Sequence, residues 1–139
     1  MRGYTALDEW QRIFVQRDWN KLPHLLADDV TYFNPGDAMP LRGKQAVVGS
    51  LGLSFSIFEN FEYMRHFNGD EGHVLEFRGY VGDTAFTGID IIRFDLAGKI
   101  MDLVVMIRPI AAILELGEEA ARRRASASAS ASANKTAQD

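Results

Sequence analysis

One carboxylate stands in the middle of an otherwise apolar strand face. Over residues 84–95, alternate side chains point to the same side of a strand, and Asp90 shares its side with Phe86, Gly88, Ile92 and Phe94. Burial of an unpaired carboxylate is costly, so such a group is neutral, hydrogen-bonded or close to water. Desolvation raises the pKa of an aspartate, which makes Asp90 a candidate general acid, general base or hydrogen-bond donor. The alternative is that this face meets solvent or a partner subunit, or that Asp90 bonds to a backbone amide.

The flanking stretches are expected to complete an apolar pocket. Tyr32 and Asn34 are two positions apart in a strand-like stretch, so they point to the same side and add polar groups beside Asp90. One helix and the alternating strand positions supply the wall: Trp10, Phe14, Phe77, Phe86, Ile92, Leu103, Val105 and Ile107. In such a pocket Asp90 could abstract a proton next to a carbonyl group, while Tyr32 or Asn34 hydrogen-bonds the developing enolate.

The elements that position these residues follow in a simple order. Thr5 and Asp8 have the spacing of a capping box, which begins a helix with Trp10 on its apolar face. After this first helix, the expected elements are helices at 21–27, 44–58 and 110–124, and strands at 30–34, 61–67, 73–81, 84–95 and 99–108. The dipeptide Asn68-Gly69 predicts a tight hairpin turn between two of these strands. The order predicts an α+β fold, in which an antiparallel sheet has its helices gathered on one face.

The composition excludes several classes of function. The 139 residues include no cysteine, which excludes disulfides, thiolate metal sites and a cysteine nucleophile. The net charge of −4, with scattered Lys and Arg, argues against nucleic acid as a partner. No apolar run approaches the roughly 20 residues of a membrane span, and acids interrupt the N-terminus where a signal peptide is apolar. We therefore expect a cytoplasmic protein with neither a nucleic-acid nor a membrane partner.

One boundary divides the chain. From Ala125 the sequence alternates Ala and Ser, with nothing large to bury. Such a segment cannot offset its ordering entropy, so a flexible tail at 125–139 is expected after a single domain at 1–124. The three arginines at 122–124 form either the cationic last turn of a helix or a basic docking motif.

The histidines do not have the spacing of metal ligands, so neither a metal nor a cofactor is expected. His66 and His73 flank the Asn68-Gly69 dipeptide. They either meet across the hairpin or are solvated residues at the ends of two strands.

Three segments resemble the SnoaL-like and ketosteroid-isomerase branch of the nuclear transport factor 2-like superfamily. They are LLADDVTYFNP at 25–35, RGKQAV at 42–47, and GIDIIRFD at 88–95 with the Gly-Lys-Ile that follows at 98–100. The resemblance covers about residues 4–120 and rests on the order and spacing of the segments. It implies a cone-shaped, cystatin-like fold, in which N-terminal helices close a curved antiparallel sheet around an apolar pocket, and it implies a homodimer. It also implies that Asp90 matches the aspartate of the isomerase's oxyanion hole.

Two positions depart from the isomerase. Asn34 stands where it has its catalytic base, and Trp10 stands where it has its hydrogen-bonding Tyr. An amide does not accept a proton at neutral pH, so the two-site proton shuttle of the isomerase is incomplete here. The pair Tyr32 and Asn34 also resembles the water-holding pair of limonene-epoxide hydrolases, but Tyr80 and Val105 stand where that branch has its acids.

Two kinds of function therefore remain open. The first is an isomerase, cyclase or hydrolase that acts on a small, largely apolar molecule of terpenoid, polyketide or steroid-like character, through acid–base chemistry at Asp90. The second is a non-catalytic ligand-binding or dimerisation module, in which Asp90 only anchors a hydroxyl or amine. In a homodimer, the interface is expected on the outer face of the sheet, which carries Ile89, Ile91, Val104 and Met106.

Overall fold

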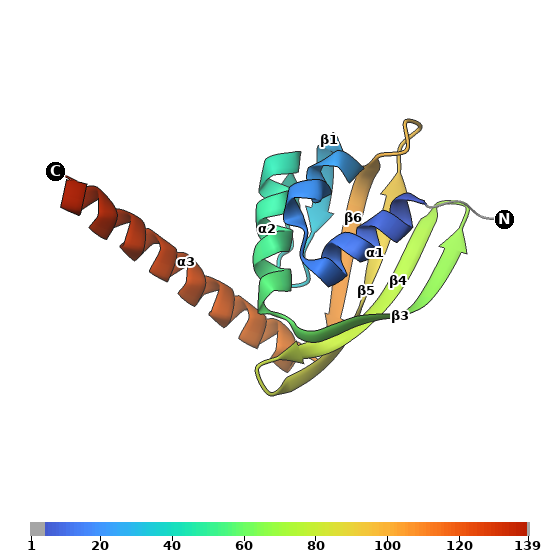
Figure 1. Ribbon diagram of the computed structural model, residues 1–139. Helices are drawn as coiled ribbons and strands as arrows, with labels where there is room; N and C mark the ends of the chain where they lie inside the picture. The colour runs from blue at the N-terminus through green and yellow to red at the C-terminus, as the bar shows by residue number, and fades with distance from the viewer. Residues whose placement is uncertain (1–4, 139) are drawn as a thin grey trace.

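The computed structural model describes residues 5–138, and it describes side chains up to residue 131. Its elements in chain order are α1 (Ala6–Gln16), the 3-10 helix η1 (Trp19–Leu25), β1 (Leu26–Phe33), β2 (Leu41–Arg42), α2 (Lys44–Ile57), β3 (Glu59–Gly69), β4 (Gly72–Val81), β5 (Thr84–Phe94), β6 (Ile100–Arg108) and α3 (Ile110–Gln138). The fold is α+β, as predicted. A curved, unclosed sheet wraps around α1, and α2 lies beside it (Figure 1).

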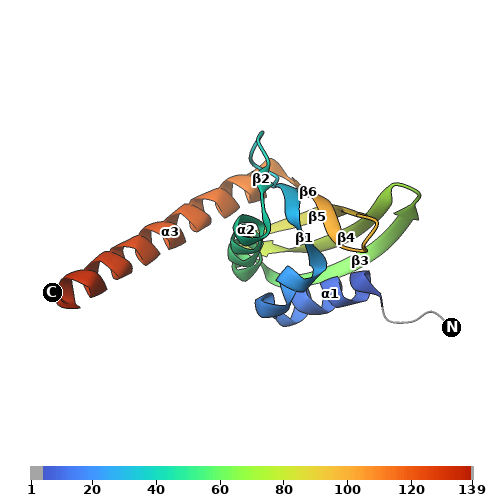
Figure 2. The same cartoon turned by 90° about the horizontal axis from the view of Figure 1, so that it is seen from above.

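The sheet has six strands in the order β2-β1-β6-β5-β4-β3. The strands β3 to β6 form the predicted antiparallel meander, whereas β1 runs parallel to β6 and antiparallel to β2. Seen from above, α3 leaves the sheet and extends away from it (Figure 2). The start of α3 nevertheless belongs to the core, where Ala112, Leu116 and Ala120 are buried.

Helix α1 begins as the sequence predicts. The Thr5 side chain accepts a hydrogen bond from the backbone N–H of Asp8, and the Asp8 carboxylate accepts one from the backbone N–H of Thr5 at 2.7 Å. This reciprocal capping box satisfies two backbone donors that a helix start leaves unpaired. The apolar residues of α1 then recur on one face and are buried against the sheet: Leu7, Trp10, Ile13 and Phe14.

Aromatic side chains fill much of the space between the helices and the sheet. Phe55 of α2 is the centre of this cluster, with its ring 4.4 Å from that of Phe14 and 5.0 Å from that of Phe61, centroid to centroid. Phe55 also lies within 6.2 Å of Phe77 on β4. Edge-to-face and tilted contacts of this kind stabilise a core beyond the area that they bury.

The second helix and the first hairpin turn differ from the prediction. The helix expected at 21–27 is the 3-10 helix Trp19–Leu25, because Pro23 lies within it and has no N–H for an α-helical bond. The hairpin turn lies at residues 70–71 rather than at Asn68-Gly69. Asn68 instead pairs with His73 across the two strands, and its side-chain oxygen bonds the His73 ring.

The last helix is longer than predicted, because α3 continues to Gln138 instead of ending at Arg124. Alanine has the highest helix propensity, and no Gly or Pro follows Arg124 to end the helix. Residues 121–131 are all exposed, and this part of α3 contacts α2 through the hydrogen bond from Arg123 to the Ser56 hydroxyl at 3.1 Å. The flexibility of the segment from Ala125 stays a prediction.

Candidate functional site

Asp90 lies on β5, at the centre of the sheet's inner face. Its partner in the register is Leu75 on one side and Val105 on the other, and all three side chains are buried. Asp90 itself is 0% exposed, and it is the only buried polar or charged residue among those that the structure describes. The strand alternation therefore predicted its position correctly, because residues two apart on β5 point to the same face.

Two side chains from other elements form a hydrogen-bonded chain that ends on Asp90. The indole N–H of Trp10 donates to the Tyr63 hydroxyl at 3.0 Å, and the Tyr63 hydroxyl donates to Oδ2 of Asp90 at 3.3 Å. The other carboxyl oxygen, Oδ1, is buried and has no hydrogen-bond partner among the described residues. One oxygen of the carboxyl group is thus held by Tyr63, and the second is buried without a partner among the described residues.

The surroundings of Asp90 favour the neutral acid. Burial raises its pKa from 3.8 to about 7, although the donors on Trp10 and Tyr63 act in the opposite direction. Burial and the nearby charge of Asp90 also raise the pKa of Tyr63 and of Tyr32 well above the ordinary value, and Asp37 raises that of Tyr32 further. Both phenols are therefore neutral hydrogen-bond donors, and Asp90 exists in both protonation states near pH 7.

The structure places the two predicted polar neighbours differently. Tyr32 on β1 is 1% exposed, and it is near enough for the charge of Asp90 to affect its pKa. Asn34 follows the end of β1, where its side-chain oxygen accepts the backbone N–H of Gly36 at 2.9 Å and its amide nitrogen donates to Asp37. The Asn34 amide is therefore used within a turn, and its expected role beside an enolate stays a prediction.

The residues predicted to line the pocket are buried, except for Ile107, which is partly buried. Several of them fill the interior rather than border an empty space. The ring of Phe14 packs against Trp10 with centroids 4.2 Å apart, and Phe86 packs against Phe58 at 4.5 Å. The Phe77 ring lies flat on β5, because Gly88 has no side chain: a Cβ there would be 2.6 Å from the ring. That these side chains surround a hollow stays a prediction.

A cavity of about 350 Å³ opens one helical turn away from Trp10, between the start of α1 and the end of the β3–β4 hairpin. We call it the mouth pocket. It is lined by Thr5, Ala6, Leu7, His66, Asn68, His73, Phe94 and Gly98. Its volume lies in the range of small-molecule sites, and it combines apolar walls with a few polar groups, as such sites do.

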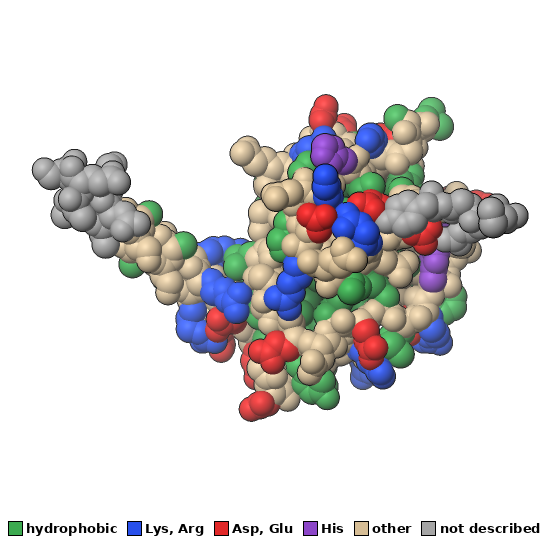
Figure 3. All heavy atoms as spheres, viewed as in Figure 1, with side chains coloured by type: hydrophobic (Ala, Val, Ile, Leu, Met, Phe, Trp, Pro, Cys, Tyr) green, Lys and Arg blue, Asp and Glu red, His purple; other side chains and the backbone are tan. Residues whose placement is uncertain are grey.

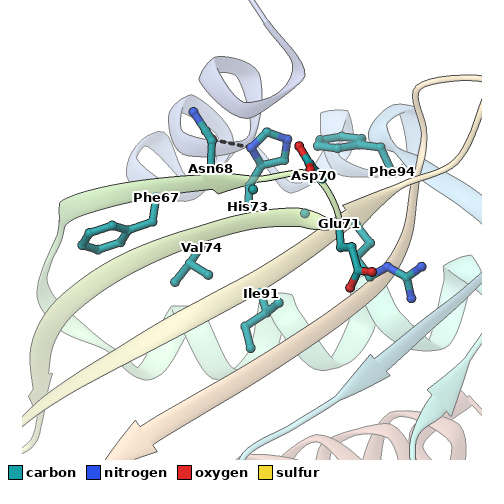
Figure 4. Close-up of a pocket in the computed structure, with 11 residues that line it drawn as sticks. Phe67, Asn68, Asp70, Glu71, His73, Val74, Ile91 and Phe94 are labelled. Carbon is teal, nitrogen blue, oxygen red and sulfur yellow. Dashed lines mark hydrogen bonds between the residues drawn. The ribbon is translucent and has the colours of Figure 1, made fainter.

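A second, larger hollow surrounds the tip of the same hairpin and has a volume of about 880 Å³. Phe67, Val74 and Ile91 point to one side of the strands there, and His73 and Phe94 lie on the other (Figure 4). This hollow spans both faces of the sheet, whereas the mouth pocket lies between α1 and the inner face.

Tyr63 and His73 were not among the predicted site residues. Tyr63 and His66, which are three residues apart on β3, both lie on the inner face because the register shifts between them. Simple alternation would place these two side chains on opposite faces. The sequence offered a signal only for the histidines, which flank the hairpin. Of the two arrangements left open, the structure shows that the His66 and His73 rings meet, with centroids 5.8 Å apart.

Among the described residues, no group of three or more His, Asp or Glu side chains could hold a metal ion. Over the same part of the chain, every helix is too short or too polar to cross a membrane.

The sequence profile of the SnoaL-like domain family matches residues 7–103. The chain belongs to this family. Residues 7–103 run from α1 to the middle of β6, so the match includes Trp10, Tyr63 and Asp90. No curated protein matches the chain.

Solved structures of several similar proteins share the fold. A steroid delta-isomerase from Pseudomonas aeruginosa is 39% identical, with a TM-score of 0.85 over 89% of this chain and 92% of that one. A bacterial protein with a cystatin-like fold from Silicibacter pomeroyi is 27% identical, with a TM-score of 0.82 over 86% of this chain and 85% of that one. A putative ketosteroid isomerase from Kribbella flavida, at 14% identity and a TM-score of 0.62 over 75% of this chain and 76% of that one, shares the fold alone. Family and neighbours together support a small-molecule-binding or isomerase-type role.

Proposed function

We propose that this SnoaL-like protein binds a small, largely apolar carbonyl compound and catalyses the movement of a proton next to its carbonyl group. Asp90 is the acid that hydrogen-bonds the carbonyl oxygen. The observation that carries the proposal is the asymmetry of this carboxyl group: Oδ2 is held by Tyr63, whereas the buried Oδ1 has no partner among the described residues.

The chemistry follows from the protonation state of Asp90. With a pKa of about 7, the group is partly protonated at neutral pH and can donate from Oδ1 to a carbonyl oxygen. When a proton leaves the adjacent carbon, negative charge develops on that oxygen, and the hydrogen bond becomes stronger in the low-dielectric interior. Removal of one such donor in enzymes that stabilise an oxyanion costs about 10²–10³ in rate.

The similarity to the steroid delta-isomerase supports this class of reaction, since isomerisation of a double bond next to a ketone begins with such a proton transfer. The isomerase-like base is absent, because position 34 is an Asn whose amide is bonded within a turn. The substrate is therefore proposed as a carbonyl compound of this general kind and not as a particular steroid.

Hydrogen exchange tests the proposal without knowledge of the natural substrate. The protein is incubated in D₂O with a panel of β,γ-unsaturated and saturated cyclic ketones, and deuterium uptake next to the carbonyl is followed by mass spectrometry. We expect uptake with the wild type, loss of it in Asp90→Asn, and retention of it in Asp83→Asn, which makes the same change at an exposed turn position. Equal uptake by wild type and Asp90→Asn would exclude Asp90 as the acid.

A second function is a non-catalytic ligand-binding module, in which Asp90 anchors a hydroxyl or amine. The departures at positions 10 and 34, where the isomerase has its hydrogen-bonding Tyr and its base, favour this alternative. It predicts that ligands bind, that Asp90→Asn weakens binding, and that no ketone of the panel takes up deuterium.

A further inference from the structure

The mouth pocket contains a histidine whose protonation pattern is set by a neighbour. Nδ1 of His73 is hydrogen-bonded to Oδ1 of Asn68, its cross-strand partner (Figure 4). An amide oxygen can only accept, so Nδ1 carries the proton. In neutral imidazole the other nitrogen then has a free lone pair. Nε2 of His73 is therefore a hydrogen-bond and proton acceptor.

The environment keeps this acceptor available at neutral pH. Burial lowers the pKa of His73 below its ordinary value, and the neighbouring His66 lowers it further. Figure 3 shows acidic and basic side chains interspersed over the face that includes α1. The titratable and charged groups on the elements around His73 are Asp8 on α1, Arg65 and His66 on β3, Asp70 and Glu71 in the hairpin turn, Arg93 on β5, and Asp95 and Lys99 between β5 and β6. These acidic and basic groups are mixed, and the two histidines are the titratable residues that line the pocket, so a neutral ligand suits it.

The acceptor and Asp90 belong to the same inner face. His73 pairs with Ile92 on β5, and Asp90 lies two residues before Ile92, so the two groups are diagonal neighbours on adjacent strands. Diagonal neighbours in an antiparallel sheet are about 7–8 Å apart. On the helix above, Leu7 lines the mouth pocket and Trp10, one turn later, bonds the Tyr63 that holds Asp90. The mouth pocket and Asp90 are therefore neighbours on one face of the sheet, although Asp90 itself does not line the pocket.

We propose that His73 is the proton acceptor of this site, where Nε2 receives a hydrogen bond or a proton from a small, largely apolar molecule that carries an acidic O–H or C–H group. The role of His73 in turnover rests on the proposed function. In its carbonyl substrate, the C–H bond next to the carbonyl group breaks and the proton goes to Nε2 of His73. The electron pair of that bond forms the enolate, whose oxygen Asp90 hydrogen-bonds. Return of the proton to the same or another carbon completes the reaction without a further reactant.

This assignment supplies the base that Asn34 cannot provide. Asn68 is then a positioning residue, because its side-chain oxygen fixes the tautomer of His73. Phe94, whose ring centroid is 5.6 Å from that of His73, restricts the imidazole from the other side.

The first test measures binding and does not depend on turnover. In ¹⁵N-edited NMR of the imidazole groups, we expect His73 with a protonated Nδ1 and a bare Nε2 at pH 7.5. Addition of 4-ethylphenol, which has an O–H donor, should shift the Nε2 signal, whereas 4-ethylanisole, which has the same apolar body and no donor, should not. Below the pKa of His73, phenol binding should weaken about tenfold per pH unit, because protonation removes the acceptor.

The variants separate this site from a general effect on the fold. His73→Gln should abolish the phenol-specific binding, and His24→Gln, at an exposed position in η1, should leave it unchanged. Asn68→Ala should lose the single tautomer, and Asn68→Asp, which keeps an acceptor oxygen, should retain it. An Nε2-protonated His73 in the wild type, or equal binding of phenol and anisole, would overturn the proposal.

The second test distinguishes this proposal from the function on which it rests. In the D₂O assay, His73→Gln should reduce deuterium uptake at least as much as Asp90→Asn while 4-ethylphenol binding to Asp90→Asn persists. If the wild type shows no uptake but binds phenol through His73, the proposed reaction fails and the binding role stands. If uptake occurs and His73→Gln retains it in full, His73 is not the base.

Discussion

The buried acid at position 90 should leave a measurable pH dependence in the stability of the protein. Unfolded aspartate titrates near pH 3.9, whereas Asp90 in the folded chain titrates at about 7. Between these values the folded state holds a proton that the unfolded state releases. The stability that belongs to this group is therefore complete below about pH 4 and is lost as the pH rises through 7. A rise from 3.8 to about 7 corresponds to about 4 kcal/mol.

The substitution Asp90→Asn removes this cost, because an amide is neutral at every pH of interest. We expect the free energy of unfolding of Asp90→Asn, relative to wild type, to increase by about 4 kcal/mol between pH 4 and pH 8, with most of the change between pH 4 and 7. Urea unfolding monitored by tryptophan fluorescence at several pH values gives this difference. Asp83→Asn, at an exposed turn position, is the matched control and should show no comparable trend. A difference between Asp90→Asn and wild type that is the same at pH 4 and pH 8 would mean that Asp90 does not titrate at a raised pKa in the folded protein.

Three further predictions concern Tyr63, two glycines and the outer face of the sheet. Tyr63→Phe removes the donor to Oδ2 of Asp90, so it should destabilise the protein by about 1–3 kcal/mol, more at pH 8 than at pH 5, in the same unfolding assay. Gly88→Ala places a Cβ 2.5 Å from the Met106 carbonyl oxygen, so it should lower the free energy of unfolding by about 1–3 kcal/mol. Gly49→Ala on α2 has open space around the new Cβ and should raise the free energy of unfolding by about 0.5–1 kcal/mol. The urea midpoints of the two variants check both predictions. We propose that two copies of the chain associate through the outer face of the sheet, where Met106 is 52% exposed. Light scattering at micromolar concentration should then give the mass of a dimer, and the mass of a monomer would contradict this proposal.

The sequence predicted those parts of the fold in which local pattern and tertiary packing agree. The capping box of Thr5 and Asp8, the apolar face of α1 and the burial of Asp90 all depend on periodicities of 3.6 or 2 residues that the chain shows openly. The strand boundaries at Val81, Thr84 and Arg108 likewise agree, because Gly82-Asp83 and Pro109 mark them.

The remaining features depend on contacts that no local pattern contains. Tyr63 reaches Asp90 on β5 because β3 pairs with β4 in a register that sets Tyr63 opposite Phe77 on the inner face. The filled aromatic interior depends on Gly88, whose missing side chain lets Phe77 lie against the sheet. Asn34 was expected to face the site, but its amide also suits a turn, and the turn provides partners close in sequence. The mouth pocket joins α1 to a hairpin about 60 residues later, and the sequence alone does not specify that approach.

The proposed function depends on a buried carboxyl group that is still partly protonated at neutral pH. Its most direct test is a ¹³C NMR titration of the Asp90 carboxyl carbon in the wild-type protein, with Asp83→Asn and Asp90→Asn used to assign the signal. The account predicts a midpoint near pH 7. A midpoint near pH 4 would contradict it, because Asp90 would then be ionised at neutral pH and could not donate to a carbonyl oxygen.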